Sequence, residues 1–304
     1  MPYQCIVCVK QVPDTAHITG EAMKEDGTVN RAALPAVFNP DDRYALEAAL
    51  DVRDQYGGTV TAITMGPLGA AEVLRECLYR GADRVILIND RRAAGSDTLA
   101  TSYILCRAVQ RLGLFDLVFC GRQAIDGDTA QVGPQLAEKL GVAQVTYFER
   151  FLELSDRTAR VRRNVGNGWE VLEARLPLVL TVLDTANQPR PAGARRVMRY
   201  KRARSDGEVV RQVEAAMPEA DEDDRQAEQA RRIETLKMAG LHIPQWGLED
   251  IEADLQWCGV SGSPTKVHRV QSIVLTKEGY HEVPPTEAGV KELVRALIVD
   301  HTLG

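Results

Sequence analysis

A dense group of hydrogen-bonding side chains follows one short apolar run, in the stretch FDLVFCGRQAIDGDTAQVGPQLAEKL (115–140). The apolar run ends at Gly121, small and polar residues follow, and a helical pattern then begins. The free N–H groups and the dipole of a helix N-terminus favour a phosphate. Arg122 could pair with phosphate or stack on a ring, while Gln123 and Gln131 offer donors and acceptors for a base or ribose. The stretch therefore has the composition of a nucleotide-binding loop, although polar caps and turns are also ordinary between a strand and a helix.

Other familiar chemical signatures are missing from the sequence. No GxGxxG follows the first strand-like run, no GxxxxGK[ST] occurs, and no serine or cysteine stands in a nucleophile elbow. Cys5 and Cys8 form a CxxC within a strand-like run, where residues three apart point to opposite faces, so we expect buried, reduced thiols. Without a nucleophile elbow, we predict no catalytic residue. We also predict no metal site, because the histidines are not spaced like metal ligands: His17, His242, His268, His281 and His301.

Strand-like and helical stretches alternate over the first part of the chain, and these elements must position the loop. The strand-like runs are QCIVCVKQV (4–12), TVTAITMG (59–66), RVILIND (84–90) and FDLVFCG (115–121). Amphipathic stretches at 41–58, 68–82 and 96–113 lie between them. Such alternation predicts a three-layer α/β fold of the Rossmann-like type, with a mostly parallel sheet. We expect three β-rich runs, at 145–154, 159–165 and 169–183, to complete this domain with antiparallel pairing at its edge.

The remainder of the chain has a different composition. Residues 190–204 are strongly basic, 216–232 form a charged low-complexity run, and 259–267 are rich in turn residues. A last amphipathic helix is expected, with an apolar face made of Val290, Leu293, Leu297 and Ile298. We therefore predict a nucleotide-binding domain at 1–190 and a C-terminal arm at 191–304 that embraces an obligate partner chain.

Composition narrows the possible partners. The formal net charge of −6 argues against a nucleic-acid partner, and no apolar run is long enough to span a bilayer. The N-terminus has the pattern of a strand rather than of a signal peptide, so a cytoplasmic protein without membrane insertion is expected. In an open parallel sheet, ligands bind outside the carboxyl ends of the strands. We expect the stretches that follow the four strand-like runs to meet there.

Motifs along nearly the whole chain resemble the β subunit of electron transfer flavoproteins. They are CVKQVPD (8–14), NPDDRYALEAAL (39–50), TMGP (64–67), GADRVILI (81–88), GRQAIDGDTAQVGPQLAE (121–138), LPLVLTV (176–182), NQPR (187–190) and GSPT (262–265). The resemblance implies a heterodimer with an α subunit that holds FAD in a mobile domain. The β subunit binds an adenine nucleotide, which is AMP in the common members. The corresponding residues here are Cys8, Asn39, Pro40, Asp41, Asp42, Met65, Gly121, Arg122, Gln123, Ala124, Ile125, Asp126, Gly127, Asp128, Thr129, Ala130, Gln131 and Val132.

A further stretch, AGSDTLATSY (94–103), resembles the branch of the family that binds a whole FAD at the β-subunit site. Asp97, Thr98 and Thr101 would lie at a helix N-terminus, suited to the second phosphate and the ribityl chain. This branch oxidises NADH and splits the electron pair between ferredoxin or flavodoxin and a dehydrogenase or quinone-linked acceptor. Arg122 is the side chain expected to stabilise the reduced flavin. Two alternatives stay open: Asp97 or its neighbour merely caps the helix and the nucleotide is AMP, or the chain is a nucleotide-sensing α/β domain.

The resemblance also indicates a region for docking the electron-transfer partner, at Ala186, Asn187 and Arg190. Where the AMP-binding branch has a leucine that docks acyl-CoA dehydrogenases, this chain has Ala186. An apolar anchor typically worth ~1.5–3 kcal/mol when buried is therefore missing. The basic residues beyond it could face an acidic partner or form a solvated linker: Arg195, Arg196, Arg199, Lys201 and Arg202.

Overall fold

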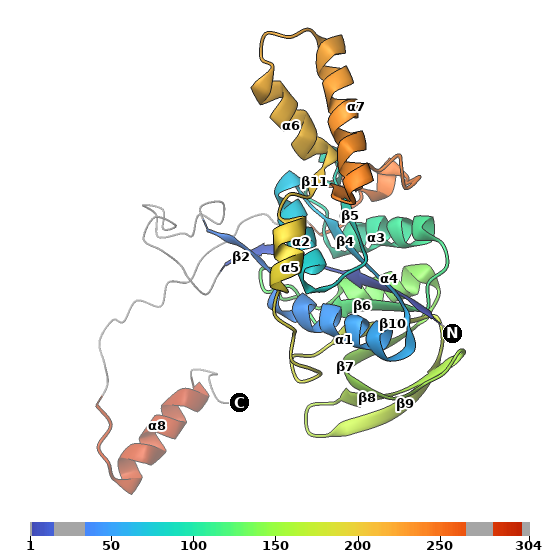
Figure 1. Cartoon of the computed structure of the whole chain (residues 1–304). Coiled ribbons are helices and arrows are strands. Elements are labelled where there is room, and N and C mark those ends of the chain that lie inside the picture. Colours follow the sequence, from blue (N-terminus) through green and yellow to red (C-terminus); the bar gives the residue numbers. More distant parts are fainter. Residues whose placement is uncertain (1, 15–33, 266–281, 300–304) are drawn as a thin grey trace.

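A nine-stranded sheet forms the centre of the computed structural model, which describes residues 2–14, 34–265 and 282–299 (Figure 1). Seven neighbouring strands are parallel, and β7, β8 and β9 pair antiparallel at one edge. The strands in spatial order are β13 (Gln245–Trp246), β5 (Arg84–Ile88), β4 (Gly58–Met65), β1 (Tyr3–Cys8), β6 (Leu117–Gly121), β10 (Leu178–Val182), β7 (Ala143–Leu154), β8 (Thr158–Asn164) and β9 (Trp169–Arg175).

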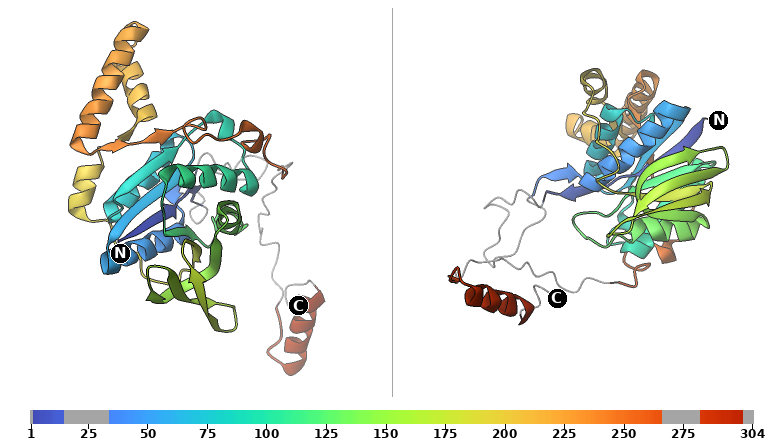
Figure 2. Two further views of the ribbon diagram at one scale, coloured as in Figure 1. Left: turned by 90° about the vertical axis from the view of Figure 1, so that its right-hand side faces the viewer. Right: turned by 90° about the horizontal axis from the view of Figure 1, so that it is seen from below.

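Helices cover both faces of this sheet. On one face α1 (Pro40–Tyr56) and α2 (Ala71–Arg80) pack into a core cluster, and on the other α3 (Thr98–Leu112) and α4 (Val132–Leu140) pack into a second (Figures 1 and 2). The alternation of side chains along β1 separates the predicted CxxC accordingly, with Cys5 in the first cluster and Cys8 in the second. The cysteines are all free and buried. The predicted three-layer, mostly parallel α/β fold is confirmed.

The run 169–183 is divided between two strands at Pro177. β9 continues the antiparallel edge, whereas β10 inserts between β6 and β7 as a parallel strand. β10 is buried along its whole length, as expected of a continuous apolar run in a parallel sheet. A smaller antiparallel pair, β2 (Gln11–Pro13) with β3 (Ala36–Phe38), follows β1.

Beyond residue 190 the chain forms further regular structure. A short helix, α5 (Ala194–Tyr200), leads to β11 (Arg204–Ser205), which pairs with β12 (His242–Ile243). Between these strands α6 (Asp206–Ala216) and α7 (Glu222–Ala239) form the projecting hairpin at the top of Figure 1. β13 then joins the main sheet beside β5, so the segment predicted as an arm supplies an edge strand. The division at residue 190 stays a prediction.

The charged run 216–232 lies mostly within this hairpin. Ser205 and Glu208 form a capping box at the start of α6, and the Asp221 side chain accepts a hydrogen bond from the Asp224 N–H at the start of α7. α7 has no buried residue, which is why the sequence shows so little apolar periodicity there.

The last described helix is α8 (Glu287–Val299). Three of its four predicted apolar-face residues are exposed, namely Val290, Leu293 and Ile298, and Leu297 is half-buried. None of the helices in the described ranges is both long and apolar enough to cross a membrane. His17, His268, His281 and His301 lie outside the described residues, and His242 contacts Asp206 with 2.8 Å between Nε2 and Oδ1.

Candidate functional site

A cavity of about 340 Å³ lies at the carboxyl ends of β1, β4 and β6. The strand order reverses between β1 and β6, and ligands of open α/β sheets bind at such a reversal. The volume falls in the range of small-molecule sites, about 300–1,000 Å³. Most of the predicted site residues line this cavity: Cys8, Asp42, Met65, Asp97, Thr98, Thr101, Gly121, Arg122, Gln123, Ala124, Gly127, Thr129, Ala130, Gln131 and Val132.

The other predicted residues lie outside the lining, and some of them support it: Asn39, Pro40, Asp41, Ile125, Asp126 and Asp128. Asn39 is fully buried just before α1. Its Nδ2 donates to the Gln123 carbonyl at 2.8 Å, and its Oδ1 accepts from the Ile125 N–H at 3.2 Å. The Asn39 side chain makes no hydrogen bond that caps α1, so its polar groups serve the cavity loop.

Asp42 joins the ends of two strands beneath the cavity. Its carboxylate accepts from the Lys10 N–H at 2.8 Å, just after β1, and from the Gly121 N–H at 3.2 Å, at the end of β6. A Cβ on Gly121 would overlap the Asp42 side chain, so only glycine permits this close approach. Burial raises the pKa of Asp42 to about 7, while hydrogen bonds from Asn39 and from the two backbone N–H groups oppose the rise.

Ion pairs and a strained backbone shape the loop that follows β6. Arg122 Nε lies 3.3 Å from Asp41 Oδ2, and Lys10 Nζ lies 2.7 Å from Asp126 Oδ1. Burial raises the pKa of Asp41, although Arg122 opposes the rise. Asp128 and Ala130 have positive φ values of 50° and 54°. Such conformations cost of order 1–3 kcal/mol at a non-glycine residue and are often found at ligand sites.

The N-terminus of α3 forms the opposite wall. Asp97 Oδ1 accepts from the Ala100 N–H at 3.0 Å, so the helix-cap interpretation of Asp97 holds in the structure. Burial tends to raise the pKa of Asp97, but hydrogen bonds from backbone N–H groups outweigh it and the pKa is lowered. Thr98 Oγ1 donates to Gln131 Oε1 at 2.8 Å and so connects the two walls. Whether Asp97, Thr98 and Thr101 contact a ligand stays a prediction.

A second cavity of about 350 Å³ adjoins the first at the ends of β4 and β5. The two cavities share Met65 and Ser96. Asn89 borders the second cavity, and its side chain is fixed by donating to the Gly66 carbonyl at 2.8 Å.

Several lining residues were missed from the sequence: Val9, Lys10, Ser96, Leu105, Cys120 and Gly133. Two of these residues could have been predicted from their positions in the sequence. Lys10 lies inside the CVKQVPD motif directly after β1, and Leu105 lies one helical turn beyond Thr101. Cys120 depends on strand register, because it stands beside Cys8 in the parallel pairing of β1 with β6. A hydrogen bond between these thiols, together with burial, raises the pKa of Cys8.

Comparison with known proteins decides the family. The model of the electron transfer flavoprotein domain matches residues 26–216, more than half of the chain. The chain belongs to the electron transfer flavoprotein β-subunit family. It is 36% identical to the electron transfer flavoprotein subunit beta of Clostridium acetobutylicum, with 97% of this chain and 98% of that protein covered.

Two other relatives of this family member are similar over nearly their whole length. Protein FixA of Azorhizobium caulinodans is 38% identical over 95% of this chain and 93% of that protein. The caffeyl-CoA reductase–Etf complex subunit CarD of Acetobacterium woodii is 37% identical over 98% of this chain and 94% of that protein. These findings confirm the family inferred from the motifs, with its likeness to the flavin-binding branch.

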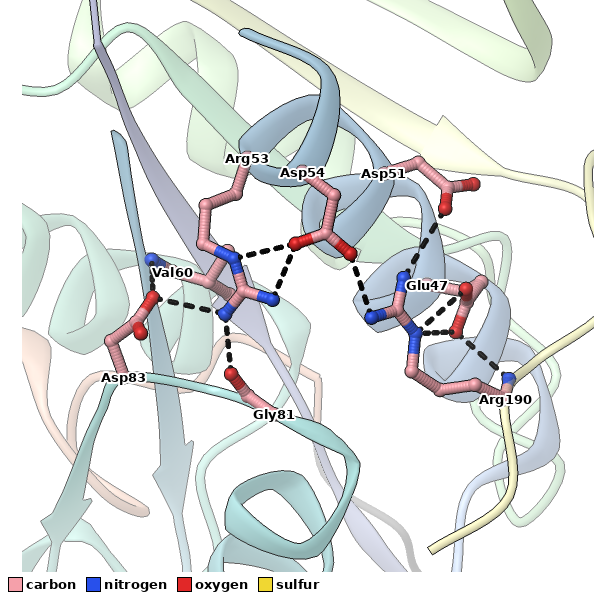
Figure 3. A network of polar contacts seen from close by, with 8 residues as sticks. All are labelled: Glu47, Asp51, Arg53, Asp54, Val60, Gly81, Asp83 and Arg190. Atoms are coloured by element: carbon pink, nitrogen blue, oxygen red, sulfur yellow. Dashed lines mark hydrogen bonds and ion pairs between the residues drawn. The ribbon is translucent and has the colours of Figure 1, made fainter. Parts of the chain in front are cut away.

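In this β subunit, the residues predicted to dock an electron-transfer partner are engaged within the chain. Asn187 Nδ2 donates to the Tyr44 carbonyl at 2.9 Å, and Ala186 packs against the core. Arg190 contacts Glu47 at 2.9 Å and also the next two acidic residues along α1 (Figure 3). The segment is thereby held on α1, and its docking role stays a prediction.

The basic residues that follow lie in and just after α5. Arg195, Arg196, Arg199, Lys201 and Arg202 are all exposed. Among the described residues, no group of three or more His, Cys, Asp or Glu side chains is placed to hold a metal ion.

Proposed function

We propose that this chain binds FAD in its cavity and, as the β subunit of a heterodimer, takes part in NADH-dependent electron bifurcation. The proposal rests chiefly on one observation: Thr98 and Thr101 line the same cavity as the loop 121–132. AMP has one phosphate and requires one anion-binding wall. Here the N-termini of α3 and α4 both lie at the cavity, which suits the two phosphates of a dinucleotide.

The residues present fit FAD. Threonine hydroxyls can bond a phosphate or the ribityl chain, and Gln123 and Gln131 can bond a base or sugar edge. The second cavity, joined at Met65 and Ser96, offers room for a ligand larger than AMP. When bound, FAD supplies the redox chemistry, accepting a hydride from NADH and transferring single electrons.

The part of the protein is to orient the bound flavin and to set the charge around it. Arg122 lines the cavity beside Asp41, with about 40% of its side chain exposed. Its guanidinium is always charged, so it would favour added negative charge on a bound ligand. Asn39 and Asp42 would hold the loop in one conformation, which limits the ordering that binding requires.

The proposed partners follow from the family. The obligate partner is an electron transfer flavoprotein α subunit, and the acceptors are ferredoxin or flavodoxin together with an acyl-CoA dehydrogenase or a quinone-linked oxidoreductase. Two relatives are named as subunits that serve caffeyl-CoA and acryloyl-CoA reductases, which supports an acceptor of the acyl-CoA-oxidoreductase class. A cytoplasmic location belongs to the same proposal.

A second candidate is a one-flavin carrier that holds AMP in this site. The Asp97 carboxylate favours it, because both of its oxygens already accept backbone N–H groups and cap a helix without any ligand. The experiment is to co-express the chain with its α subunit, denature the complex, and quantify the released FAD and AMP. Two FAD and no AMP per heterodimer would support bifurcation. One FAD with one AMP would refute it and establish the second candidate.

A further inference from the structure

A turn at the end of the described range 34–265 packs against the α3 wall of the cavity. We call residues 259–265 the C-terminal turn; it contains the GSPT motif. The orange-red segment that leads into it lies beside α3 in Figures 1 and 2. There the Asp254 N–H donates to the Tyr103 hydroxyl at 2.9 Å, and Cys258 is buried in the same core cluster as Ile104.

The C-terminal turn forms hydrogen bonds with the two residues that precede α3. The Asp97 N–H donates to Ser263 Oγ at 2.8 Å, and the Thr265 N–H donates to Asp97 Oδ2 at 3.0 Å. The Gly259 N–H donates to Ser96 Oγ at 3.1 Å. Ser263 is almost fully buried, and its hydroxyl donates a hydrogen bond to the Gly259 carbonyl at 2.6 Å.

Close packing reinforces these bonds. Gly259 has a φ of +59°, and a Cβ there would overlap the Arg92 carbonyl oxygen. The turn therefore fits the backbone just before α3 more closely than a side chain would allow. Ser96 and Asp97, which it holds, line the first cavity, and Ser96 also lines the second.

The two walls of the cavity thus have separate supports. Asn39 and Asp42 hold the wall formed by the loop after β6, and their hydrogen bonds go to that loop and to the end of β1 rather than to residues 259–265. Ser263 and Thr265 hold the wall before α3. Across the cavity, Thr98 bonds to Gln131 and more weakly to Gln135, at 3.4 Å. Because the supports differ, loss of the bonds to Ser263 and Thr265 would leave the bonds that Asn39 and Asp42 make to the other wall intact.

We propose that the C-terminal turn determines which nucleotide the cavity accepts. Ser263 is the positioning residue: it fixes the Ser96–Asp97 backbone and so builds the wall that a dinucleotide needs and a mononucleotide does not. This inference rests on the proposed function, since it assumes FAD as the larger ligand.

The test uses the heterodimer with its α subunit. Ser263→Ala leaves the half-buried Asp97 N–H without its buried acceptor, which corresponds to about 10-fold in affinity for a ligand that requires this wall. We expect that loss for FAD at the β-subunit site and an AMP affinity within about twofold of wild type. Asp97→Asn is the second variant, because its amide can still cap α3 but loses the acceptor for the Thr265 N–H. Asp97→Asn should likewise weaken FAD binding and keep AMP binding.

Ser261→Ala is the matched control. Ser261 lies in the same turn and is exposed, and within the described ranges its hydroxyl donates to the Cys258 carbonyl alone, at 3.0 Å. Equilibrium dialysis against FAD and AMP measures both affinities, and retained AMP binding shows that a variant is folded. Amide hydrogen exchange should be faster at Asp97 and Ala100 in Ser263→Ala than in the control.

Each outcome has one meaning. Selective loss of FAD in Ser263→Ala and Asp97→Asn, with normal Ser261→Ala, supports the inference. A wild-type site that takes FAD, with both variants unchanged or with FAD and AMP lost equally, overturns the inference alone. A wild-type site that takes AMP and no FAD overturns the inference together with the proposed function.

Discussion

The buried side chain of Asn39 should determine how well the loop after β6 is formed. Asn39→Ala removes the donor to the Gln123 carbonyl and the acceptor of the Ile125 N–H. Asn39 is fully buried but Gln123 and Ile125 are half-buried, so each hydrogen bond contributes about 0.5–1.5 kcal/mol and the closed loop loses about 1–3 kcal/mol. The other loop contacts cannot replace this, since ion pairs at exposed positions such as Lys10 with Asp126 contribute about 0–1 kcal/mol.

The loss should appear as weaker nucleotide binding. If the loop must close before a ligand binds, the apparent affinity falls by the fraction of molecules that are closed. A loss of about 2 kcal/mol corresponds to at most about 30-fold in dissociation constant, reached when the wild-type loop is only just stable in its closed form. Equilibrium dialysis of the heterodimer against FAD and AMP measures the two dissociation constants. Binding of both ligands should weaken, because both use this wall.

Asn164→Ala is the control for this prediction. Asn164 also donates one hydrogen bond and accepts one, to Glu149 at 3.2 Å and from the Gly166 N–H at 2.7 Å, but it lies at the end of β8. Its replacement should lower the melting temperature without changing nucleotide affinity. The reasoning is refuted if Asn39→Ala binds both nucleotides within about threefold of wild type, or if Asn164→Ala weakens binding equally.

Three further changes test other parts of the site. The raised pKa of Asp42 means that the folded state holds this proton more tightly than the unfolded state, where the pKa is about 3.9. The resulting stabilisation is complete below about pH 4 and is lost as the pH rises through about 7, so Asp42→Asn should reduce the decline in urea-denaturation stability between about pH 5 and pH 8. Arg122→Ala should loosen the bound nucleotide and lower NADH oxidation; unchanged nucleotide content and rate would remove Arg122 from the mechanism. Glu47→Gln should destabilise the fold by about 1–3 kcal/mol, because the largely buried Glu47 accepts from Arg190. Asp51→Asn, at a more exposed contact of Arg190, should cost less than about 0.5 kcal/mol, and equal losses would contradict this view of the network.

Local pattern was enough to predict the mostly parallel sheet and the principal loop, but not the insertion of β10 between β6 and β7. Continuous apolar runs such as those of β6 and β10 are typical of strands buried on both faces, and a polar turn after such a strand falls at the ligand-binding edge. The position of Asn39 came from the family resemblance. By sequence alone it would be a helix cap, because nothing local indicates a bond to a residue 84 positions away.

The remaining features depend on contacts over longer separations. Ser263 and Asp97 are 166 positions apart, and local pattern predicts only a turn around the first and a helix cap at the second. β13 has only two residues, too few for any periodicity, and its place in the sheet depends on pairing with β5. The attachment of the segment around Arg190 has no local signal either, because the ion pairs that hold it come from residues of α1.

The separate supports of the two walls have a consequence during synthesis. The chain emerges from the ribosome N-terminus first, and domains begin to fold in that order. Asn39, Asp42 and the loop after β6 are all translated well before Ser263, so the wall that suits a mononucleotide can form while the other wall still lacks its support. A nascent chain with this incomplete site could then bind AMP. Selectivity for the larger ligand would arise only after the C-terminal turn had been synthesised and had folded against α3.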